Sequence, residues 1–340
     1  MASVDVVVPS YNYGRYLTRC IDSLLSQENV EVRVLIIDDA SSDETPQIGT
    51  ALAQRDSRVQ FRRHEKNLGH IATYNEGLLG WASGDYSLLI SADDLLAPGC
   101  LARASSVLER HPCASMAYGS AMIFYDDDYP KPAEVAADFQ YRIAPSAQFI
   151  ERCFTVGNPV PTACAVVRTS VQHAVGKYAA ALPHSADMDM WMRFAAHGDI
   201  AMIRPVQGYY RKHFSAMSRN YYLQYNRDRR EVIATGDGIV AALRDRFPEL
   251  PRLNAQLRRR LALQSCWDAG EALETDNPEQ FAACAQFARE ADPGIRLTSA
   301  WMRLQAKRLL GRRILRALKR SGSASAAVTE TYSREFGWWE

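Results

Sequence analysis

Carboxylate side chains follow two apolar runs in the first hundred residues of the sequence. Asp38 and Asp39 stand at the end of VRVLIID, and Asp93 and Asp94 follow YSLLISA. Adjacent carboxylates at the end of a buried strand repel one another, and a divalent cation offsets that repulsion. Mg²⁺ and Mn²⁺ take one or two protein carboxylates and complete their coordination with water and substrate phosphate oxygens. The pairs therefore predict a metal and phosphate site. The structural alternatives are a helix cap for Asp94 and turn hydrogen bonds for the other pair.

Short β-rich runs alternate with helical patterns through the same hundred residues. We predict strands at the apolar runs 4–9, 32–38, 58–64 and 86–91. We predict helices where apolar residues recur at helical spacing, at 15–27, 45–55 and 71–82. This alternation is typical of an α/β fold whose mostly parallel, Rossmann-like sheet carries helices on both faces. Ligands of such sheets bind beyond the carboxyl ends of the strands, where PSYN (9–12) after the first strand would join the acidic pairs.

The pattern continues beyond residue 98 and then changes. We expect a helix over 98–111, a strand over 114–125, a helix from Ser146, a strand over 163–168 and a helix over 187–197. Beyond about residue 220 the strand signals end, and helices broken at 247–248 and 276–278 follow. The sequence thus predicts a first domain over 1–220, a helical C-terminal region over 221–320 and a polar, flexible tail over 321–340.

Composition argues against several classes of protein. The chain has 340 residues and a net charge of +1, which provides no overall field to attract nucleic acid. The turn PSYNYGRY holds one glycine, so it lacks the G-x-G-x-x-G of a dinucleotide fold and the Gly- and Lys/Arg-rich triphosphate loop of a nucleotidyltransferase. Seven scattered cysteines without a C-x-x-C pair favour buried thiols over disulfides or zinc. With no signal peptide and no run of about 20 apolar residues, the protein is expected to be cytoplasmic, or peripheral at the inner face of the membrane.

Four ordered motifs carry a resemblance to a known family. They are VVVPSYNYGRYLTRCIDSLLSQ, VLIIDDASSDET, EKNLGHIATYNEGL and SADDLLAPGCL. Together, over roughly residues 3–215, they resemble the family 2 glycosyltransferases, which have a GT-A fold and invert the anomeric centre. The resemblance implies a catalytic domain over 1–220 that takes a UDP-, GDP- or dTDP-sugar as its donor and uses Mn²⁺ or Mg²⁺.

The resemblance also implies which residues hold the donor. Tyr11 would stack on the nucleotide base, Asp39 would accept hydrogen bonds from that base, and Asp38 would support the loop. Asp93 would bind the metal, and His213 would be a second metal ligand or a phosphate contact. The implied donor-binding residues are Pro9, Tyr11, Asn12, Asp38, Asp39, Asn67, Gly69, Asn75, Ser91, Asp94 and Arg211. Lys212 and Arg219 are alternatives to Arg211 for neutralising the leaving nucleotide.

Two positions depart from the family pattern. Ser91 stands in place of the first carboxylate of the D-x-D motif, where its hydroxyl can contact a ribose or a water but is a poor metal ligand. NLG (67–69) and NEG (75–77) match the paired N-x-G pattern that shapes the floor beneath the nucleotide sugar. Tyr74 replaces a basic residue often found before the second of these asparagines.

A second group of carboxylates lies in PHSADMDMWMRFAAHGDI. An inverting transfer needs a base opposite the leaving group, because the acceptor hydroxyl loses its proton as it attacks. Asp187 and Asp189 open a predicted helix but, at i and i+2, they cannot both point the same way. The family's Glu-Asp motif, aligned on Trp191, places its Asp at Asp187 and its Glu at Ala186. Asp187 is therefore the predicted base and Asp189 the second candidate, and the alternative is that both stabilise the helix N-terminus.

The segment WMRLQAKRLLGRRILRALKR (301–320) has eight basic residues and no acidic ones. Its apolar residues Met302, Ala306, Leu310, Ile314 and Leu318 fall on one helical line. A basic amphipathic helix of this kind is typical of membrane-surface binding. The alternative is a helix that docks on the catalytic domain and leaves its basic face in solvent.

These observations predict an inverting, metal-dependent glycosyltransferase. Its acceptor would be a hydroxyl of a glycan or a lipid-linked oligosaccharide in surface polysaccharide biosynthesis. The rival hypothesis is a non-catalytic relative that binds a nucleotide or a glycan as the partner of another enzyme. Ser91 and Ala186 favour that rival.

Overall fold

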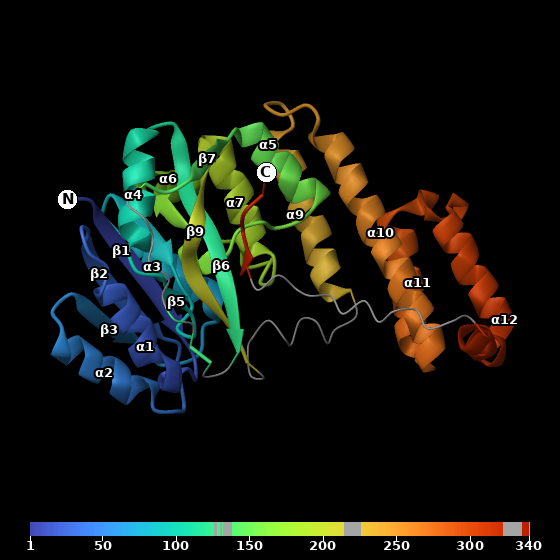
Figure 1. Cartoon of the computed structure of the whole chain (residues 1–340), viewed down its shortest axis with the longest axis horizontal. Helices are drawn as coiled ribbons and strands as arrows, with labels where there is room; N and C mark the ends of the chain where they lie inside the picture. Colours follow the sequence, from blue (N-terminus) through green and yellow to red (C-terminus); the bar gives the residue numbers. More distant parts are fainter. Residues whose placement is uncertain (126–127, 130, 132–137, 214–225, 322–334, 340) are drawn as a thin grey trace. The chain divides into compact units, whose positions relative to one another are not determined.

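The computed structural model describes residues 1–125, 128–129, 131, 138–213, 226–321 and 335–339. The chain forms two compact units. The first consists of Met1–Phe214 together with Ser333–Glu340, and the second of Ser215–Tyr332 (Figure 1).

Four parallel strands form one half of the sheet in the first unit. They are β1 (Ser3–Ser10), β2 (Glu31–Asp38), β3 (Val59–Arg63) and β4 (Tyr86–Leu89), in the order β3-β2-β1-β4. Both faces of β1 and β4 are buried, which explains their almost continuous apolar runs. The four strands predicted from these runs are confirmed.

The other half of the sheet is mixed. β8 (Val166–Arg168) pairs antiparallel with β4 and β6 (Ala114–Tyr125), and β6 pairs parallel with β9 (Asp199–Lys212). Three short strands complete it: β5 (Leu95–Leu96) and β7 (Tyr141–Ala144) on β9, and β10 (Glu335–Phe336) on β6. The longest ladders are parallel, so the predicted α/β class with a mostly parallel sheet is confirmed.

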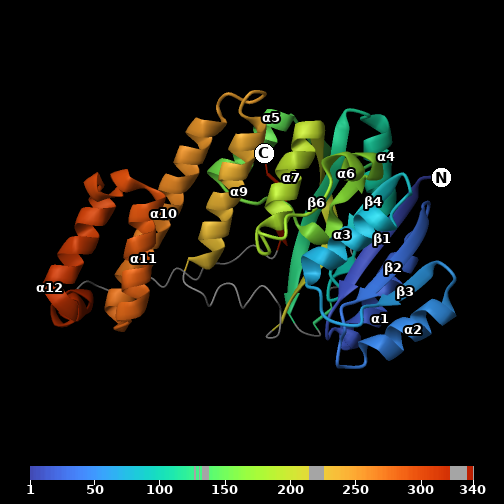
Figure 2. The ribbon, with the colours of Figure 1, turned by 180° about the vertical axis from the view of Figure 1, so that it is seen from behind.

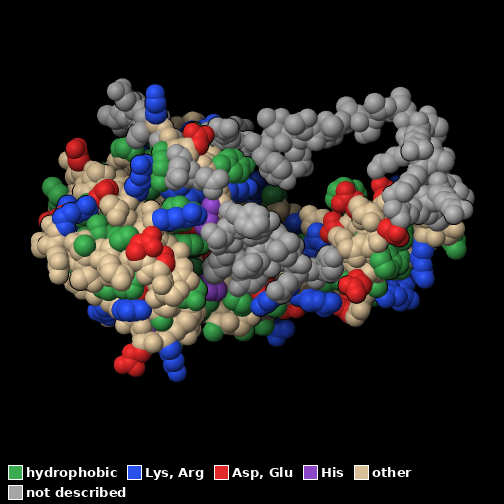
Figure 3. Space-filling view, turned by 90° about the horizontal axis from the view of Figure 1, so that it is seen from below, with side chains coloured by type: hydrophobic (Ala, Val, Ile, Leu, Met, Phe, Trp, Pro, Cys, Tyr) green, Lys and Arg blue, Asp and Glu red, His purple; other side chains and the backbone are tan. Residues whose placement is uncertain are grey.

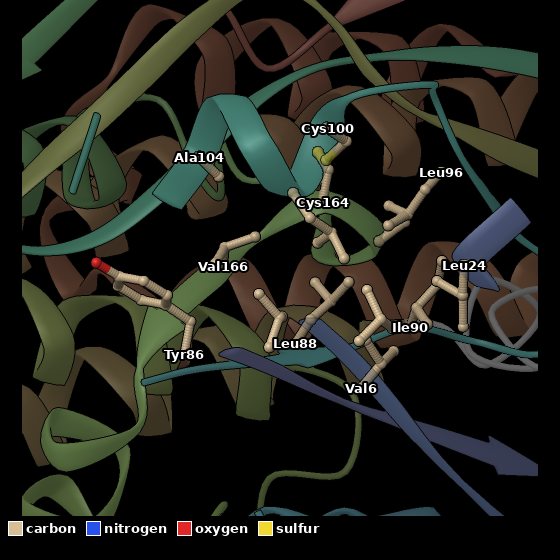
Figure 4. Close-up of a cluster of buried hydrophobic side chains, with 14 of the residues drawn as sticks. Val6, Leu24, Tyr86, Leu88, Ile90, Leu96, Cys100, Ala104, Cys164 and Val166 are labelled. Atoms are coloured by element: carbon tan, nitrogen blue, oxygen red, sulfur yellow. The ribbon is translucent and has the colours of Figure 1, made fainter. Parts of the chain in front are cut away.

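Helices cover both faces of this sheet. On one face lie α1 (Gly14–Leu25), α2 (Thr45–Arg55) and α4 (Cys100–Arg110), and on the other α3 (His70–Gly80), α6 (Thr169–Val175) and α7 (Ala186–His197) (Figures 1 and 2). α5 (Ser146–Thr155) packs on α7 and β9. Figure 4 shows the core of the first face, where Val6 and Leu88 meet Leu24 of α1 and Cys100 of α4. Alternate side chains of β1 therefore pack against helices on opposite faces of the sheet.

The contact of α3 with the sheet depends on a glycine. A Cβ on Gly77 would lie 2.4 Å from Val7 Cγ1, so the helix backbone rests directly on β1. We expect Gly77→Ala to lower the free energy of unfolding by about 1–3 kcal/mol, because the added methyl group overfills this contact. The matched control is Gly80→Ala at the end of the same helix, where a Cβ meets nothing within 4 Å. Urea unfolding should separate the two variants, and equal midpoints would contradict this close packing.

Some elements were not expected from the sequence. β5, β7, β10 and α6 are short, and the strand expected over 163–168 begins as a 3-10 turn, Thr162–Cys164. The last residues of the expected flexible tail also differ from the prediction. Glu335 and Phe336 pair with β6, and the buried Trp339 donates its indole N–H to Tyr118 Oη at 2.9 Å. Pairing partners more than 200 residues away leave no local signal.

The second unit is helical. It contains α9 (Arg227–Leu243), α10 (Leu250–Thr275), α11 (Pro278–Ala291), a 3-10 turn (Pro293–Leu297) and α12 (Ser299–Ser321). The expected breaks lie at the observed boundaries. The side chain of Asn277 accepts a hydrogen bond from Gln280 N and caps α11, whose first residue is a proline. No helix in the described part of the chain is long and apolar enough to cross a membrane.

The cysteines and the surface charges agree with expectation. All seven cysteines are free thiols and six are buried, which confirms the prediction of buried thiols. On the face of the first unit seen in Figure 3, Lys and Arg side chains lie among Asp and Glu side chains. This intermixing fits the net charge of +1.

Candidate active site

Three predicted segments follow strands that are neighbours in the sheet. β1 lies between β2 and β4, so the residues after these three strands emerge at one edge. The backbone N–H of Asp39 donates to Ser10 O at 2.9 Å, and that of Asn12 donates to Ser41 Oγ at 2.8 Å. The turns after β1 and β2 are therefore hydrogen-bonded to each other.

The turn after β1 presents one aromatic ring. Pro9 still pairs with β2, and Tyr11 beyond it is 49% exposed. Asn12 has a positive φ of 58°, and its side-chain Oδ1 accepts the backbone N–H of Ser42 at 2.9 Å. Tyr11 is thus accessible to a ligand, whereas the Asn12 side chain braces the neighbouring loop.

The two carboxylates after β2 differ in their surroundings. Asp38 is fully buried, accepts the N–H of Ser41 at 3.0 Å and lies 3.1 Å from Arg63 Nε. Arg63 also donates to Ser41 O at 2.9 Å. Asp38 therefore holds its own loop through Ser41 and Arg63.

Asp39 organises the turn before α3. Its Oδ1 accepts the N–H of Leu68 at 2.7 Å and its Oδ2 the N–H of Gly69 at 2.8 Å. Gly69 has a φ of 86°, a left-handed conformation that favours glycine, and Asn67 Oδ1 accepts the same N–H at 3.0 Å. A Cβ on Gly69 would meet nothing within 4 Å. The N-x-G turn thus wraps the Asp39 carboxylate, and its glycine faces open space.

His64, at the end of β3, is a site residue that the sequence analysis missed. Its Nδ1 lies 2.7 Å from Asp39 Oδ1 and its Nε2 lies 2.8 Å from Glu76 Oε2. The available signal was its position at the carboxyl end of a parallel strand, the edge where ligands bind in such sheets.

Asn75 is hydrogen-bonded to the backbone of Tyr178. Its Oδ1 accepts the N–H of Tyr178 at 2.7 Å and its Nδ2 donates to Tyr178 O at 3.1 Å. His70 Nε2 lies 2.8 Å from Pro183 O. These contacts tie α3 to the segment that leads into α7, so the Asn75 amide is engaged by the protein backbone.

The acidic pair after β4 meets residues from the end of β9. His213 Nε2 lies 3.0 Å from Asp93 Oδ2, and both side chains are buried. The N–H of Arg211 donates to Asp94 Oδ1 at 2.9 Å, and its Nε donates to Asp93 O at 2.8 Å. The antiparallel pairing of β5 with β9 brings these segments together. Ser91 closes the turn, because its carbonyl accepts the N–H of Asp94 at 3.1 Å.

The environment of Asp94 and Arg211 limits their access to a ligand. Burial, together with the neighbouring Asp93 carboxylate, raises the pKa of Asp94 well above its ordinary value. The Arg211 side chain is 1% exposed, and its guanidinium lies 4.4 Å from the ring centroids of Tyr16 and Phe124. Arg211 therefore holds the Asp93–Asp94 turn, Lys212 is exposed, and Arg219 lies outside the described residues.

The Asp93 and His213 pair fits an octahedral cation. A carboxylate oxygen and an imidazole nitrogen converge within 3.0 Å of each other and leave the other coordination positions to water and phosphate. The described residues hold no group of three or more His, Cys, Asp or Glu side chains arranged for a metal. An ion at this place would be held by Asp93 Oδ2 and His213 Nε2.

Asp187 lies at the start of α7 and is held by three donors. Its Oδ2 accepts Asn158 Nδ2 at 3.1 Å and Thr162 Oγ1 at 3.3 Å, and its Oδ1 accepts the N–H of Met188 at 2.7 Å. Burial raises the pKa of Asp187 despite these hydrogen bonds. Both side-chain donors come from one segment, NPVPT (158–162), for which we made no prediction of a functional role.

Asp189 faces a different partner. Its Oδ2 accepts Arg193 Nε at 2.9 Å, and Arg193 also donates to Val175 O at 3.0 Å and Lys177 O at 2.8 Å. The pair links α7 to the end of α6. The structure therefore gives Asp187 and Asp189 separate partners, as their i, i+2 spacing led us to expect.

Asp187 and the acidic turn after β4 share a support. Thr162 opens the 3-10 turn Thr162–Cys164, which packs against β4, β5 and β9. These three strands carry or position Asp93 and His213. The turn thus joins the two carboxylate sites within one unit.

Part of the chain matches a known protein family. Residues 5–174, half of the chain, match glycosyl transferase family 2. The glycosyltransferase GlyG of Streptococcus pneumoniae is 32% identical over 93 residues, which cover 27% of this chain and 31% of GlyG. The chain thus spans about a third of the length of the first curated relatives that it matches.

Two solved structures share the fold. S. aureus TarS 1-349 in complex with UDP has a TM-score of 0.60 at 16% identity, covering 95% of this chain and 93% of that one. The mannosyltransferase PcManGT of Pyrobaculum calidifontis, in complex with GDP-Man and Mn²⁺, has a TM-score of 0.53 at 17% identity, covering 94% and 87%. The match over half of the chain and the GT-A-like fold together show that this protein belongs to glycosyl transferase family 2.

Proposed function

We propose that the protein transfers a sugar from a nucleoside-diphosphate sugar to an acceptor hydroxyl, with inversion at the anomeric carbon. One observation carries this proposal. The Asp93–His213 pair and Asp187 are two separate acidic sites, and the turn Thr162–Cys164 connects their supports. An inverting transfer needs two such sites, one for the diphosphate and one for the acceptor proton.

On the donor side, the exposed Tyr11 ring can stack on a base whose N–H groups reach Asp39. Asp93 and His213 would hold Mn²⁺ or Mg²⁺, which supplies screening of the diphosphate and stabilises it as a leaving group. The GDP-Man and Mn²⁺ bound to PcManGT, and the UDP-GlcNAc bound to a TarS structure, support a nucleotide sugar as the donor class.

On the acceptor side, Asp187 would take the proton of the attacking hydroxyl. Its raised pKa makes it a stronger base than an ordinary aspartate, and Asn158 and Thr162 fix the orientation of the carboxylate. The Ala186 that replaces the family's glutamate is buried, so Asp187 acts without an acidic neighbour at that position.

The Asn158 contact gives a testable pH effect. Asn158→Ala removes a donor that favours the ionised carboxylate, so the pKa of Asp187 should rise further. Because the base must be ionised, the acidic limb of the kcat/KM profile should move to higher pH. Asn254→Ala in α10 is the matched control and should leave the limb in place. An unmoved limb in Asn158→Ala would contradict the assigned base.

The acceptor is proposed to be a glycan or a lipid-linked oligosaccharide of a surface polysaccharide pathway. In α12, Met302 is 57% exposed and Leu310 44% exposed, whereas Leu304 is buried in the helical unit. Met302, Ala306 and Leu310, the described residues of the predicted apolar line, therefore face away from that unit, which supports peripheral contact with a membrane surface. Co-sedimentation with anionic vesicles that is lost in Met302→Glu would support this contact, and no sedimentation of the wild type would refute it.

A donor screen tests the proposed function directly. UDP-, GDP- and dTDP-sugars are added to the purified protein with Mn²⁺, and thermal stabilisation and nucleotide release are measured. Stabilisation by one donor together with nucleotide release supports the transferase. Metal-independent stabilisation without turnover would instead support the non-catalytic relative.

A further inference from the structure

His64 lies between two carboxylates at the edge of the sheet where the donor is proposed to bind. Its Nδ1 is 2.7 Å from Asp39 Oδ1 and its Nε2 is 2.8 Å from Glu76 Oε2. The imidazole is almost fully enclosed, with 9% of its side chain exposed. It therefore links the Asp39 carboxylate, which follows β2, to the Glu76 carboxylate of α3.

The two contacts determine the protonation state that fits this position. Ionised carboxylates only accept hydrogen bonds, and a neutral imidazole carries one N–H. Only the doubly protonated imidazolium can donate to Asp39 and Glu76 together. Burial alone would lower the pKa of His64, but the hydrogen bonds to these carboxylates outweigh it and raise the pKa.

The other charges near this group are already paired. Arg62 Nη1 lies 3.4 Å from Glu76 Oε1, and Arg63 Nε lies 3.1 Å from Asp38 Oδ2. Each arginine is thus paired with a carboxylate other than that of Asp39, whereas His64 contacts Asp39 itself.

The Asp39 carboxylate has a limited number of acceptor sites. A carboxylate offers about four lone-pair sites. Three donors engage Asp39: His64 Nδ1 and Leu68 N on Oδ1, and Gly69 N on Oδ2. This arrangement fixes the rotation of the carboxylate and leaves acceptor capacity on Oδ2.

We propose that protonated His64 is a positioning residue that orients Asp39 for the N–H of the nucleotide base. This inference rests on the proposed function, because it takes Asp39 to be the base-binding residue. When His64 loses its proton, it can donate to only one of its two carboxylates. The single N–H that remains is then divided between Asp39 and Glu76. Asp39 is therefore held less firmly, and recognition of the base weakens as the pH rises. His64 thereby makes donor affinity depend on pH without touching the reacting atoms.

Calorimetry of the whole protein with UDP-glucose and GDP-mannose in the presence of Mn²⁺ tests the proposal. Both probes are diphosphate diesters that stay ionised between about pH 5.5 and 8.5, so their own titration does not interfere. For the tighter-binding probe, wild-type affinity should fall about tenfold across this range, the effect of one weakened charge-assisted hydrogen bond. His64→Gln should show the weaker affinity at every pH. Glu76→Gln should keep the low-pH affinity and move the fall to lower pH.

Two controls separate positioning from general damage. His111→Gln removes a histidine that contacts Tyr141 Oη at 3.1 Å and should leave the profile unchanged. Pyrophosphate with Mn²⁺ lacks a base, so at each pH it should bind His64→Gln as well as it binds the wild type. Equal loss of pyrophosphate and nucleotide-sugar affinity in His64→Gln would overturn the proposal, as would a flat wild-type profile.

A measurement on the wild type keeps the proposal testable if the variants do not fold. The His64 imidazole should titrate by NMR above the ordinary histidine pKa of about 6.5. Titration at or below that value would refute the doubly donating form. If the wild type binds none of the UDP-, GDP- and dTDP-sugars of the donor screen, the proposed function itself fails. If it binds one of them and the pH profile is flat, only the role of His64 fails.

Discussion

Asp187→Asn is expected to lower kcat for sugar transfer by about 10³- to 10⁴-fold, the upper part of the range for a lost general base. Asparagine is isosteric, and its amide oxygen can still accept the hydrogen bonds from Asn158 and Thr162, so the position should stay folded although the bond from the Met188 N–H is lost. Its amide cannot take the proton of the acceptor hydroxyl. Steady-state kinetics with the donor identified by the screen measure the loss. Calorimetry should show donor affinity within about threefold of the wild type, because the substitution lies outside the donor site.

The matched control for this prediction lies two residues away on the same helix. Asp189→Asn removes the ion pair with Arg193 but leaves Asp187 and its donors intact. We expect it to lower the melting temperature only slightly, because a partly exposed ion pair contributes little to stability. It should retain at least about a tenth of the wild-type kcat, because the Asp187 carboxylate is unchanged. If Asp189→Asn lost activity as severely as Asp187→Asn, the assignment of a single base would be wrong.

The sequence predicted the edge of the sheet that carries the site because strand ends are local features. Apolar runs identify the strands, and the residues that follow them can be identified directly. Asp38 and Asp39 therefore fell at the correct edge of the sheet. Their different environments depend on Arg63 and on the Leu68–Gly69 amides, which come from other elements. Position could be predicted, but hydrogen-bond partners could not.

The same limit explains the asparagines. Asn12 and Asn75 match the family motifs and were expected in the donor site, yet their side chains bond the backbone of Ser42 and Tyr178. An amide serves a ligand or a backbone equally well, so its residue type does not distinguish the two roles. Tyr178 lies 103 residues from Asn75, and no local sequence pattern predicts such a contact.

Long-range pairing also assembled the metal-binding candidate. Asp93 and His213 are 120 residues apart and meet because β5, a strand of two residues, pairs with β9. So short a strand has no readable periodicity. The strand-end carboxylates predicted Asp93, and His213 was predicted through the resemblance alone. The physical reason for their contact appears only in the fold.

Asp93→Asn is expected to lower kcat/KM by about 10²- to 10³-fold, comparable to the loss of one charge-stabilising group at a leaving group. Asparagine keeps the size of the side chain, but its neutral amide is a weaker ligand for Mg²⁺ or Mn²⁺ than a carboxylate is. Wild-type protein should bind the nucleotide sugar more tightly with Mn²⁺ than with a chelator, and Asp93→Asn should lose most of that difference. Calorimetry with and without Mn²⁺ measures it.

Asp94→Asn separates the two members of the acidic pair. Asp94 is enclosed, and its Oδ1 accepts the N–H of Arg211, a role that an asparagine oxygen can fill. The substitution also removes the repulsion between adjacent carboxylates. We therefore expect Asp94→Asn to stay within about fivefold of wild-type kcat/KM and to keep the Mn²⁺ effect, since a buried hydrogen bond is conserved. Loss of the Mn²⁺ effect in Asp94→Asn but not in Asp93→Asn would reverse the assignment. Asp94 would then be the carboxylate that binds the metal ion, and Asp93 would serve only to hold His213.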